Sequence, residues 1–211
     1  MRLTLHTFLT LDGVLQAPGG PDEDPSDGFT YGGWSVPFDD EDFGAAMTGY
    51  FEHAEAFLLG RRTYEIFAGF WPHVQGTEMD GPIAQKLNAL PKYVASTTLN
   101  SLQWENSQLI SGDVADAVRK LKEQPGGELQ VHGSGALATY LIDQQLVDEF
   151  RLITYPVYLG TGKRLFADGV RPGALRMLNS FTMPGGVIVA TYEFAGAPTY
   201  GSYALDGPAT E

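Results

Sequence analysis

The chain has 211 residues, no cysteine, and 26 acidic against 13 basic side chains, which give a formal net charge of −13. The acidic balance excludes a general nucleic-acid surface, which needs basic side chains to replace counterions, and the missing cysteines exclude disulfides and thiolate metal sites. Since we find neither an apolar run long enough to span a membrane nor a signal-peptide pattern after Met1, we expect a cytoplasmic protein with no nucleic-acid or membrane partner.

The first half of the chain alternates predicted strands and helices. Apolar and polar residues alternate over residues 3–11, which predicts an opening strand. A loop rich in Gly, Pro and Asp follows over residues 12–38, and a loop of that length in a compact domain is usually functional or mobile. Apolar spacing and Pro or Gly punctuation then predict, in order, a helix over 43–54, a strand at 56–59, helical segments at 62–69 and 81–90, and a strand at 92–96.

The second half begins with a helix and ends in strands. Asp113 has the side chain of an N-cap, and it opens a helix that runs to Glu123 and is ended by Pro125-Gly126-Gly127. The elements predicted after it are a strand at 129–132, a helix at 136–142, and extended segments at 148–159, 175–182 and 187–194. This order predicts an α/β fold whose sheet is mostly parallel with an antiparallel C-terminal edge. We expect one domain over residues 1–195 and a C-terminal tail over 196–211.

Two clusters of acidic residues lie in the first part of the chain, at 21–27 and 39–42. A calcium loop needs oxygen ligands at alternating positions around a central glycine, and neither cluster has that spacing. Both clusters are typical of solvated loops and of a helix start, where carboxylates suit the positive end of the helix dipole. We therefore predict no metal site.

Three strand ends carry groups that suit an anion. Gly133-Ser134-Gly135 lies between a strand and a helix, where unpaired amides and the helix dipole favour negative charge, although a purely structural turn explains it equally well. Gly60-Arg61-Arg62-Thr63 also leads from a strand into a helix, and its guanidinium groups suit phosphate oxygens as well as they suit a solvated surface. Ser96-Thr97 ends the next strand with hydroxyl groups. Ligands of open α/β sheets bind at the carboxyl ends of strands, so the coincidence of all three turns favours a binding site.

A series of short motifs follows in a specific order over nearly the whole chain, to about Phe194: Thr10-Leu11-Asp12-Gly13-Val14, Gly60-Arg61-Arg62-Thr63-Tyr64, Leu90-Pro91 with Ser96-Thr97, Gly133-Ser134-Gly135, Val147-Asp148-Glu149, Pro156-Val157-Tyr158-Leu159-Gly160, and Leu165-Phe166. This order resembles the dihydrofolate reductase-like superfamily, and within it the C-terminal reductase domain of the bifunctional riboflavin-biosynthesis deaminase/reductase. The resemblance implies a three-layer fold with a central mixed sheet and helices on both faces, and it implies a homodimer.

The resemblance also implies NADPH as the cofactor. By matching positions, the adenosine 2′-phosphate and the pyrophosphate would be held by Arg61, Arg62 and Thr63, and the adenosine phosphate end would contact Ser96 and Thr97. The pyrophosphate, close to the nicotinamide, would lie on Gly133, Ser134, Gly135, Ala136 and Leu137. The first-helix carboxylate of folate reducers falls near Gly44, and their tail-binding arginine falls at Leu90. Folate is therefore not the expected substrate.

Six side chains are candidates for the substrate pocket that the resemblance implies. Asp12 is the candidate catalytic residue, against the alternative of an Asp-Gly turn that closes the strand. His6 would reach the pocket with an ordinary pKa near neutrality, or would sit satisfied in the core. Trp34 would stack on a planar heterocycle or act as a hydrophobic plug. The pocket or the core would take the remaining aromatic residues, Phe51, Tyr64 and Tyr155.

These inferences predict an NADPH-dependent oxidoreductase that transfers hydride to a small heterocyclic substrate, pterin-like or pyrimidine-like. It would be similar to 5-amino-6-(5-phosphoribosylamino)uracil reductase or to dihydrofolate reductase. A catalytically idle nucleotide-binding protein of the same fold is an alternative, which the missing first-helix carboxylate favours. A further alternative is an acidic interaction domain that binds no nucleotide. Turnover of oxidised pterins would distinguish the enzyme from the idle nucleotide-binding protein. Nucleotide binding would distinguish both of them from the interaction domain.

Overall fold

The computed structural model describes residues 1–203, apart from the side chains of residues 41 and 42, so the predicted tail is described only in part. The strands are β1 (Arg2–Thr10), β2 (Ala54–Gly60), β3 (Lys92–Ala95), β4 (Ser107–Leu109), β5 (Glu128–His132), β6 (Glu149–Tyr155), β7 (Leu175–Thr182) and β8 (Ile188–Phe194). The helices are α1 (Glu41–Phe51), α2 (Arg61–Ala68), α3 (Pro82–Ala89), α4 (Val114–Glu123) and α5 (Gly135–Asp143), with 3-10 turns η1 (Ser26–Gly28), η2 (Val36–Phe38) and η3 (Trp71–Val74).

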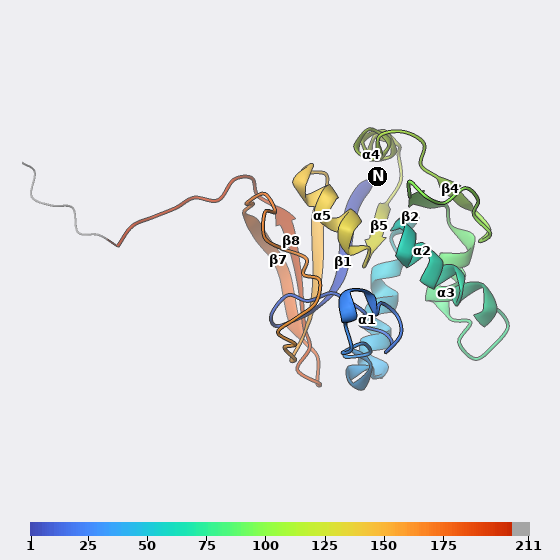
Figure 1. Cartoon of the computed structure of the whole chain (residues 1–211), viewed down its shortest axis with the longest axis horizontal. Helices are drawn as coiled ribbons and strands as arrows, with labels where there is room; N and C mark the ends of the chain where they lie inside the picture. The colour runs from blue at the N-terminus through green and yellow to red at the C-terminus, as the bar shows by residue number, and fades with distance from the viewer. Residues whose placement is uncertain (204–211) are drawn as a thin grey trace, which may run out of the picture.

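All eight strands form one sheet in the order β4-β3-β2-β5-β1-β6-β8-β7. In this order, the strands from β4 to β6 run parallel to one another, whereas β8 is antiparallel to both β6 and β7. The antiparallel pair forms one edge of the sheet and β4 lies at the other (Figure 1). The predicted fold class, a mostly parallel sheet with an antiparallel C-terminal edge, is confirmed.

Alternation along each strand gives the sheet two different faces. On one face, α4 and α5 pack on a continuous apolar layer that includes Leu3, Leu5, Leu129, Val131 and Phe150. The opposite face is covered by α1, α2 and α3, which contribute to two separate apolar clusters. One of these clusters lies over β6 and β8 and the other over β2 and β3. Between them, the strands β1, β5 and β6 carry polar side chains.

Local sequence explains where the helices begin. The Asp113 carboxylate accepts a hydrogen bond from the Asp116 amide at 2.9 Å, which confirms the predicted N-cap of α4. The Asp40 carboxylate caps α1 in the same way, accepting from the Phe43 amide at 2.8 Å. The helix α2 starts without such a side-chain cap directly after Gly60, the last residue of β2. Its first turn therefore presents amides and two arginines at the carboxyl edge of the sheet.

Candidate functional site

The turn after β5 and the start of α2 are joined by two hydrogen bonds. The Ser134 amide donates to the Thr63 hydroxyl oxygen at 3.1 Å, and the Gly60 amide donates to the Ser134 hydroxyl oxygen at 3.0 Å. Residue 95 pairs with Gly60 in the β2–β3 register, so Ser96 comes next at the same edge. The three strand ends that the sequence singled out thus lie side by side at the carboxyl edge of β3, β2 and β5.

The cations and hydroxyls at this edge differ in how freely they project. Arg61 is exposed, and its ion pair with Glu65, within the part of the chain that the structure describes, is a long one at 4.0 Å. Arg62 instead turns towards residues 12–38, where it contacts the Asp24 carboxylate and donates to the Ser26 hydroxyl oxygen at 3.0 Å. The Ser96 hydroxyl oxygen accepts from the amides of residues 98 and 99, so it caps its own turn, while Thr97 is exposed.

The turn at residues 133–135 fits an anionic cofactor in part. Gly133 and Ser134 both have positive φ angles, 54° and 53°, and a Cβ on Gly133 would meet only the Thr63 hydroxyl, at 3.9 Å, so a ligand has room to approach. Gly135 is different, because its Cβ would lie 2.8 Å from Leu15 of the long loop. Ala136 is exposed at the start of α5, whereas Leu137 belongs to the apolar core. The open space at Gly133 leaves room for a phosphate group. The helix amides and the exposed Arg61 are groups that suit the phosphates of a nicotinamide dinucleotide.

Asp12 holds a turn together. Its carboxylate accepts hydrogen bonds from the Thr10 hydroxyl at 2.6 Å and from the amides of Leu159 and Gly160 at 3.2 and 2.8 Å, and it pairs with Arg164 at 3.3 Å. Desolvation acts to raise the pKa of Asp12, but these hydrogen bonds outweigh it and lower the pKa to about 2. Asp12 is therefore ionised near neutral pH and has no proton to give, which fits the turn alternative better than proton transfer.

Trp34 and Tyr155 fill the space next to the end of β1. Trp34 is 7% exposed, its indole N–H donates to the Gln16 carbonyl at 2.8 Å, and its ring meets the Tyr155 ring edge-on at 5.3 Å. Phe8, Phe38 and Phe43 pack on the same Tyr155 ring. Burial, and then the charge of Asp39, raise the pKa of the Tyr155 phenol, so it stays protonated. This packing is compatible with the plug alternative for Trp34, and stacking on a heterocycle stays a prediction.

His6 of β1 lies on the same face of the sheet as Trp34. Its ring stacks on His132 at 4.5 Å, and His132 stacks in turn on Phe51 at 4.7 Å. The Gly133 amide donates to the His6 carbonyl at 3.1 Å, so the backbone of His6 lies beside the glycine turn, which His132 directly precedes in the chain. Burial, aided by the neighbouring Arg151 charge, lowers the pKa of His132 to about 3, and burial lowers the pKa of His6 well below its ordinary value. Both rings are neutral.

Tyr64 lies in the same apolar cluster as Phe51, apart from Trp34 and Tyr155. Its hydroxyl oxygen accepts hydrogen bonds from the amides of Gln103 and Trp104, at 3.0 and 3.1 Å, and its ring belongs to the apolar cluster over β2 and β3. The neighbouring Trp104 also carries the buried Lys92 ammonium over its ring, 4.3 Å from the centroid. Burial lowers the pKa of Lys92 to about 8. Tyr64 has a structural place here, as the core alternative stated.

Sequence reasoning missed a buried ionic cluster between the two apolar clusters. Arg151 donates to both Glu128 oxygens at 2.9 and 2.5 Å and to Glu149 at 2.6 Å, and its guanidinium lies 4.8 Å from the centre of the Tyr50 ring. Glu128, Glu149 and Arg151 are each less than 10% exposed. A signal was present, because polar residues alternate in β5 and β6 as they do in β1.

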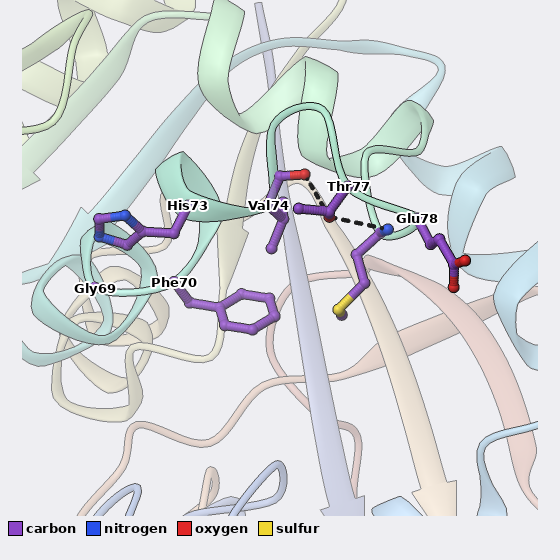
Figure 2. Close-up of a pocket in the computed structure, with 7 residues that line it drawn as sticks. Gly69, Phe70, His73, Val74, Thr77 and Glu78 are labelled. Carbon is purple, nitrogen blue, oxygen red and sulfur yellow. Dashed lines mark hydrogen bonds between the residues drawn. The ribbon is translucent and has the colours of Figure 1, made fainter.

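A hollow of about 470 Å³ lies away from these strand ends. A single stretch of chain between α2 and α3 lines it: Gly69, Phe70, His73, Val74, Thr77, Glu78 and Met79. Figure 2 shows the Phe70 ring beneath Val74, with His73 and Glu78 pointing away in opposite directions. The Thr77 hydroxyl donates to the Val74 carbonyl at 2.7 Å, so the polar groups serve the turn itself. None of these residues belongs to the candidate site.

Comparison with known proteins decides the family. The sequence profile of the RibD C-terminal domain matches residues 2–189. The chain belongs to this family. It is 29% identical over 195 residues to the uncharacterized protein YyaP of Bacillus subtilis (strain 168), which covers 92% of this chain and 96% of that protein. It is 25% identical over 179 residues to the uncharacterized protein YwjB of the same organism, covering 83% and 88%.

Solved structures share the fold. A putative riboflavin biosynthesis protein from Shewanella sp. PV-4 superposes with a TM-score of 0.65 at 20% identity, covering 92% of this chain and 99% of that one. A pyrimidine reductase-like protein from Corynebacterium diphtheriae gives 0.60 at 14% identity, with 92% of each chain covered. The predicted resemblance to the riboflavin-pathway reductase branch is confirmed, and the family is oxidoreductase-like.

No helix within residues 1–203 is long and apolar enough to cross a bilayer. Across the same part of the chain, no three or more His, Asp or Glu side chains gather in a way that would hold a metal ion.

Proposed function

We propose that the protein is an NADPH-dependent reductase that transfers hydride to a small pterin-like or pyrimidine-like heterocycle. The observation that supports this most is the hydrogen-bonded junction of Thr63 and Ser134, which joins two strand-to-helix turns next to the exposed Arg61. The helix amides and the guanidinium suit the phosphates of a dinucleotide, and a 2′-phosphate is the group that a guanidinium fork favours. When bound, NADPH supplies the hydride.

The chain's own groups would orient the reactants and exclude water. Leu15 packs against Gly135 and brings the long loop over the turn, so the loop would shield a cofactor placed there. Asp12 is ionised and the two imidazoles are neutral, so none of them carries a proton ready to donate near neutral pH. The proton would then come from water or from the substrate's own tautomer. The idle nucleotide-binding alternative keeps the same site and lacks turnover.

Titration with NADPH and, separately, NADH tests the proposal through quenching of tryptophan emission. We expect micromolar NADPH binding, with NADH much weaker, and an Arg61→Gln variant that weakens NADPH by about tenfold because it removes a charge-assisted contact. Arg171→Gln removes an equal charge at an exposed residue far along the chain and should leave binding unchanged. Absence of saturable binding to either nucleotide would overturn the proposal. Binding without oxidation of NADPH by any oxidised pterin or pyrimidine would favour the idle protein.

We also propose that two copies pair through β7. This edge strand is exposed along almost its whole length, and Met177, Leu178 and Phe181 are 52%, 42% and 40% exposed. Long apolar edge strands are usually covered, since their free backbone groups invite pairing, and a second β7 is self-complementary to the first. Sizing with light scattering should give a dimer, and Phe181→Lys should give a monomer. A monomer from the unaltered protein at micromolar concentration contradicts the pairing.

A further inference from the structure

Two cations from separate segments converge on one carboxylate of the long loop. Arg62 of α2 contacts the Asp24 carboxylate, and the Lys163 ammonium lies 3.0 Å from the other Asp24 oxygen. The Ser26 hydroxyl oxygen accepts from Arg62 at 3.0 Å and from Lys163 at 2.5 Å. We call these four residues the latch. The latch ties residues 12–38 both to the start of α2 and to the segment that follows β6.

Buried groups hold the latch in place. Gln16 is 2% exposed, and its side-chain amide donates to the carbonyls of Asp24 and Ser26 at 3.0 and 3.1 Å. The Lys163 amide donates back to the Gln16 side-chain oxygen at 3.0 Å. The Asp24 side chain is only 12% exposed, whereas the side chains of Arg62 and Lys163 are 45% and 44% exposed. The carboxylate is thus enclosed, and both cations can be reached from solvent.

The two cations of the latch share one enclosed carboxylate. Arg62 and Lys163 both contact Asp24, and Lys163 makes a second, longer ion pair at 3.8 Å with Asp27, whose side chain is 82% exposed and therefore strongly hydrated. Burial and then the charge of Arg62 lower the pKa of Lys163, as expected where two cations lie close together. The Ser26 hydroxyl also donates to the Asp24 carboxylate, at 2.5 Å. A guanidinium, an ammonium and a hydroxyl that all contact one position form a donor set that suits a phosphate dianion.

The latch adjoins the candidate cofactor site and open space. Arg62 precedes Thr63, whose hydroxyl holds the Ser134 amide of the glycine turn. A hollow of about 260 Å³ lies on the other side and is lined by Gln16, Asp27, Gly28, Phe29, Thr161, Gly162 and Lys163. A phosphorylated ligand that reached Arg62 and Lys163 would meet the position that Asp24 now takes.

We infer that Asp24 is an internal occupant of a phosphate-binding position formed by Arg62 and Lys163, and that a ligand phosphate binds there by displacing it. The exchange frees the loop segment around residue 24 from both cations. Because the Asp24 carboxylate competes with the ligand, it lowers the affinity of Arg62 and Lys163 for phosphate groups. The inference rests on the proposed function only in assigning the phosphate to a dinucleotide cofactor; the position itself rests on the four latch residues.

Binding of inorganic pyrophosphate, NADPH and NADH to an Asp24→Asn variant tests this by calorimetry. We expect pyrophosphate to bind about tenfold more tightly than to the unaltered protein, because the competing charge is gone while the side-chain shape stays. Asp22→Asn removes the same charge from an exposed residue of the same loop and should change the affinity less than twofold. Equal or weaker pyrophosphate binding by Asp24→Asn would overturn the inference.

The two proposals fail separately in this experiment. Tighter pyrophosphate binding by Asp24→Asn without binding of NADPH to either protein keeps the latch inference and sinks the NADPH reductase. NADPH binding to both proteins, together with pyrophosphate binding that Asp24→Asn does not tighten, keeps the reductase and sinks the latch inference.

Hydrogen exchange on the unaltered protein gives a second test that needs no variant. Saturating pyrophosphate should speed exchange of the amides at residues 22–28, since the segment loses its contacts with Arg62 and Lys163. Slower exchange of that segment on addition of pyrophosphate would mean that the phosphate adds to the latch, and the displacement would be wrong.

Discussion

The two faces of the central sheet are built from the same strands but on different principles. The face under α4 and α5 is apolar from β2 to β8, and its stability is spread over many side chains. The opposite face carries a polar band between two apolar clusters, which we define as Thr4, His6, Glu128, Gln130, His132, Glu149 and Arg151. Because most of this band is buried, each of its groups depends on a few specific partners.

The difference shows where the molecule is sensitive to single changes. An apolar layer loses stability roughly in proportion to the atoms removed. A buried ionic group responds differently, because the loss of one partner leaves the remaining charge desolvated and unpaired. The band also ends at His132, next to the glycine turn, so the costly polar groups lie directly beneath the candidate cofactor site.

Removing Arg151 should have the largest effect. Arg151→Met leaves Glu128 buried without its cation and leaves Glu149 with Arg2, whose side chain is 46% exposed, and we expect unfolding free energy to fall by about 3–5 kcal/mol. Urea unfolding followed by tryptophan emission measures it. Arg119→Met is the matched control, since Arg119 pairs with Asp116 on an exposed helix surface and should cost less than about 0.5 kcal/mol.

A triple variant sharpens the same comparison. Replacing Glu128 and Glu149 by Gln together with Arg151→Met removes all three charges, and most of the lost stability should return. A loss below about 1 kcal/mol for Arg151→Met alone would show that the buried carboxylates do not depend on this cation, and the account of the polar face would be wrong.

Acid should act on the polar face through its histidines. The pKa of His132 is about 3 in the folded protein against 6.5 ordinarily, so below pH 6.5 the unfolded state binds a proton that the folded state does not. Stability contributed by this group is therefore complete above pH 6.5 and is lost as the pH falls towards 3, by up to about 1.4 kcal/mol per pH unit. The lowered pKa of His6 adds to the loss in the same direction.

Urea unfolding at pH 7.5, 6.5, 5.5 and 5.0 measures this slope. His132→Phe should flatten it, because a phenyl ring keeps the stack on Phe51 and His6 but does not titrate. His73→Gln removes an exposed imidazole and serves as the control. Parallel slopes for His132→Phe and the unaltered protein would contradict the assignment.

Much of the fold follows from local sequence, and the exceptions have physical reasons. The strands predicted at 175–182 and at 187–194 agree with β7 and β8 because alternation and turn residues are local signals. The strand β4 was not predicted, since three residues, Ser107–Leu109, are too few for a periodic pattern. The predicted strand at 148–159 ends at Tyr155, where Pro156 begins the turn that Asp12 holds.

The candidate site could be predicted only where topology alone brings residues together. Parallel strands put the ends of β2, β3 and β5 at one edge, so the proximity of Thr63 and Ser134 could be predicted from the sequence. Their role in binding NADPH stays a prediction. The Asp24 partner of Arg62 depends on the path of a long loop, and the Arg151 partners depend on strand register. Neither set of contacts could be predicted from a local sequence pattern.

The smallest expected effect comes from Asp12, a carboxylate with as many partners as those of the polar band but with its side chain 24% exposed. Asp12→Asn keeps the shape and loses the charge, and since water partly replaces the missing contacts we expect a cost of about 1 kcal/mol in urea unfolding. NADPH affinity should change less than twofold, because Asp12 binds the turn at Leu159 and Gly160 and not the glycine turn. Thr161→Ala in the neighbouring turn, an exposed residue, controls for local disturbance. Unchanged stability together with lost turnover would instead make Asp12 a catalytic residue. Its hydrogen bonds would then serve to position a reacting group, whereas those of the buried carboxylates in the polar band serve stability.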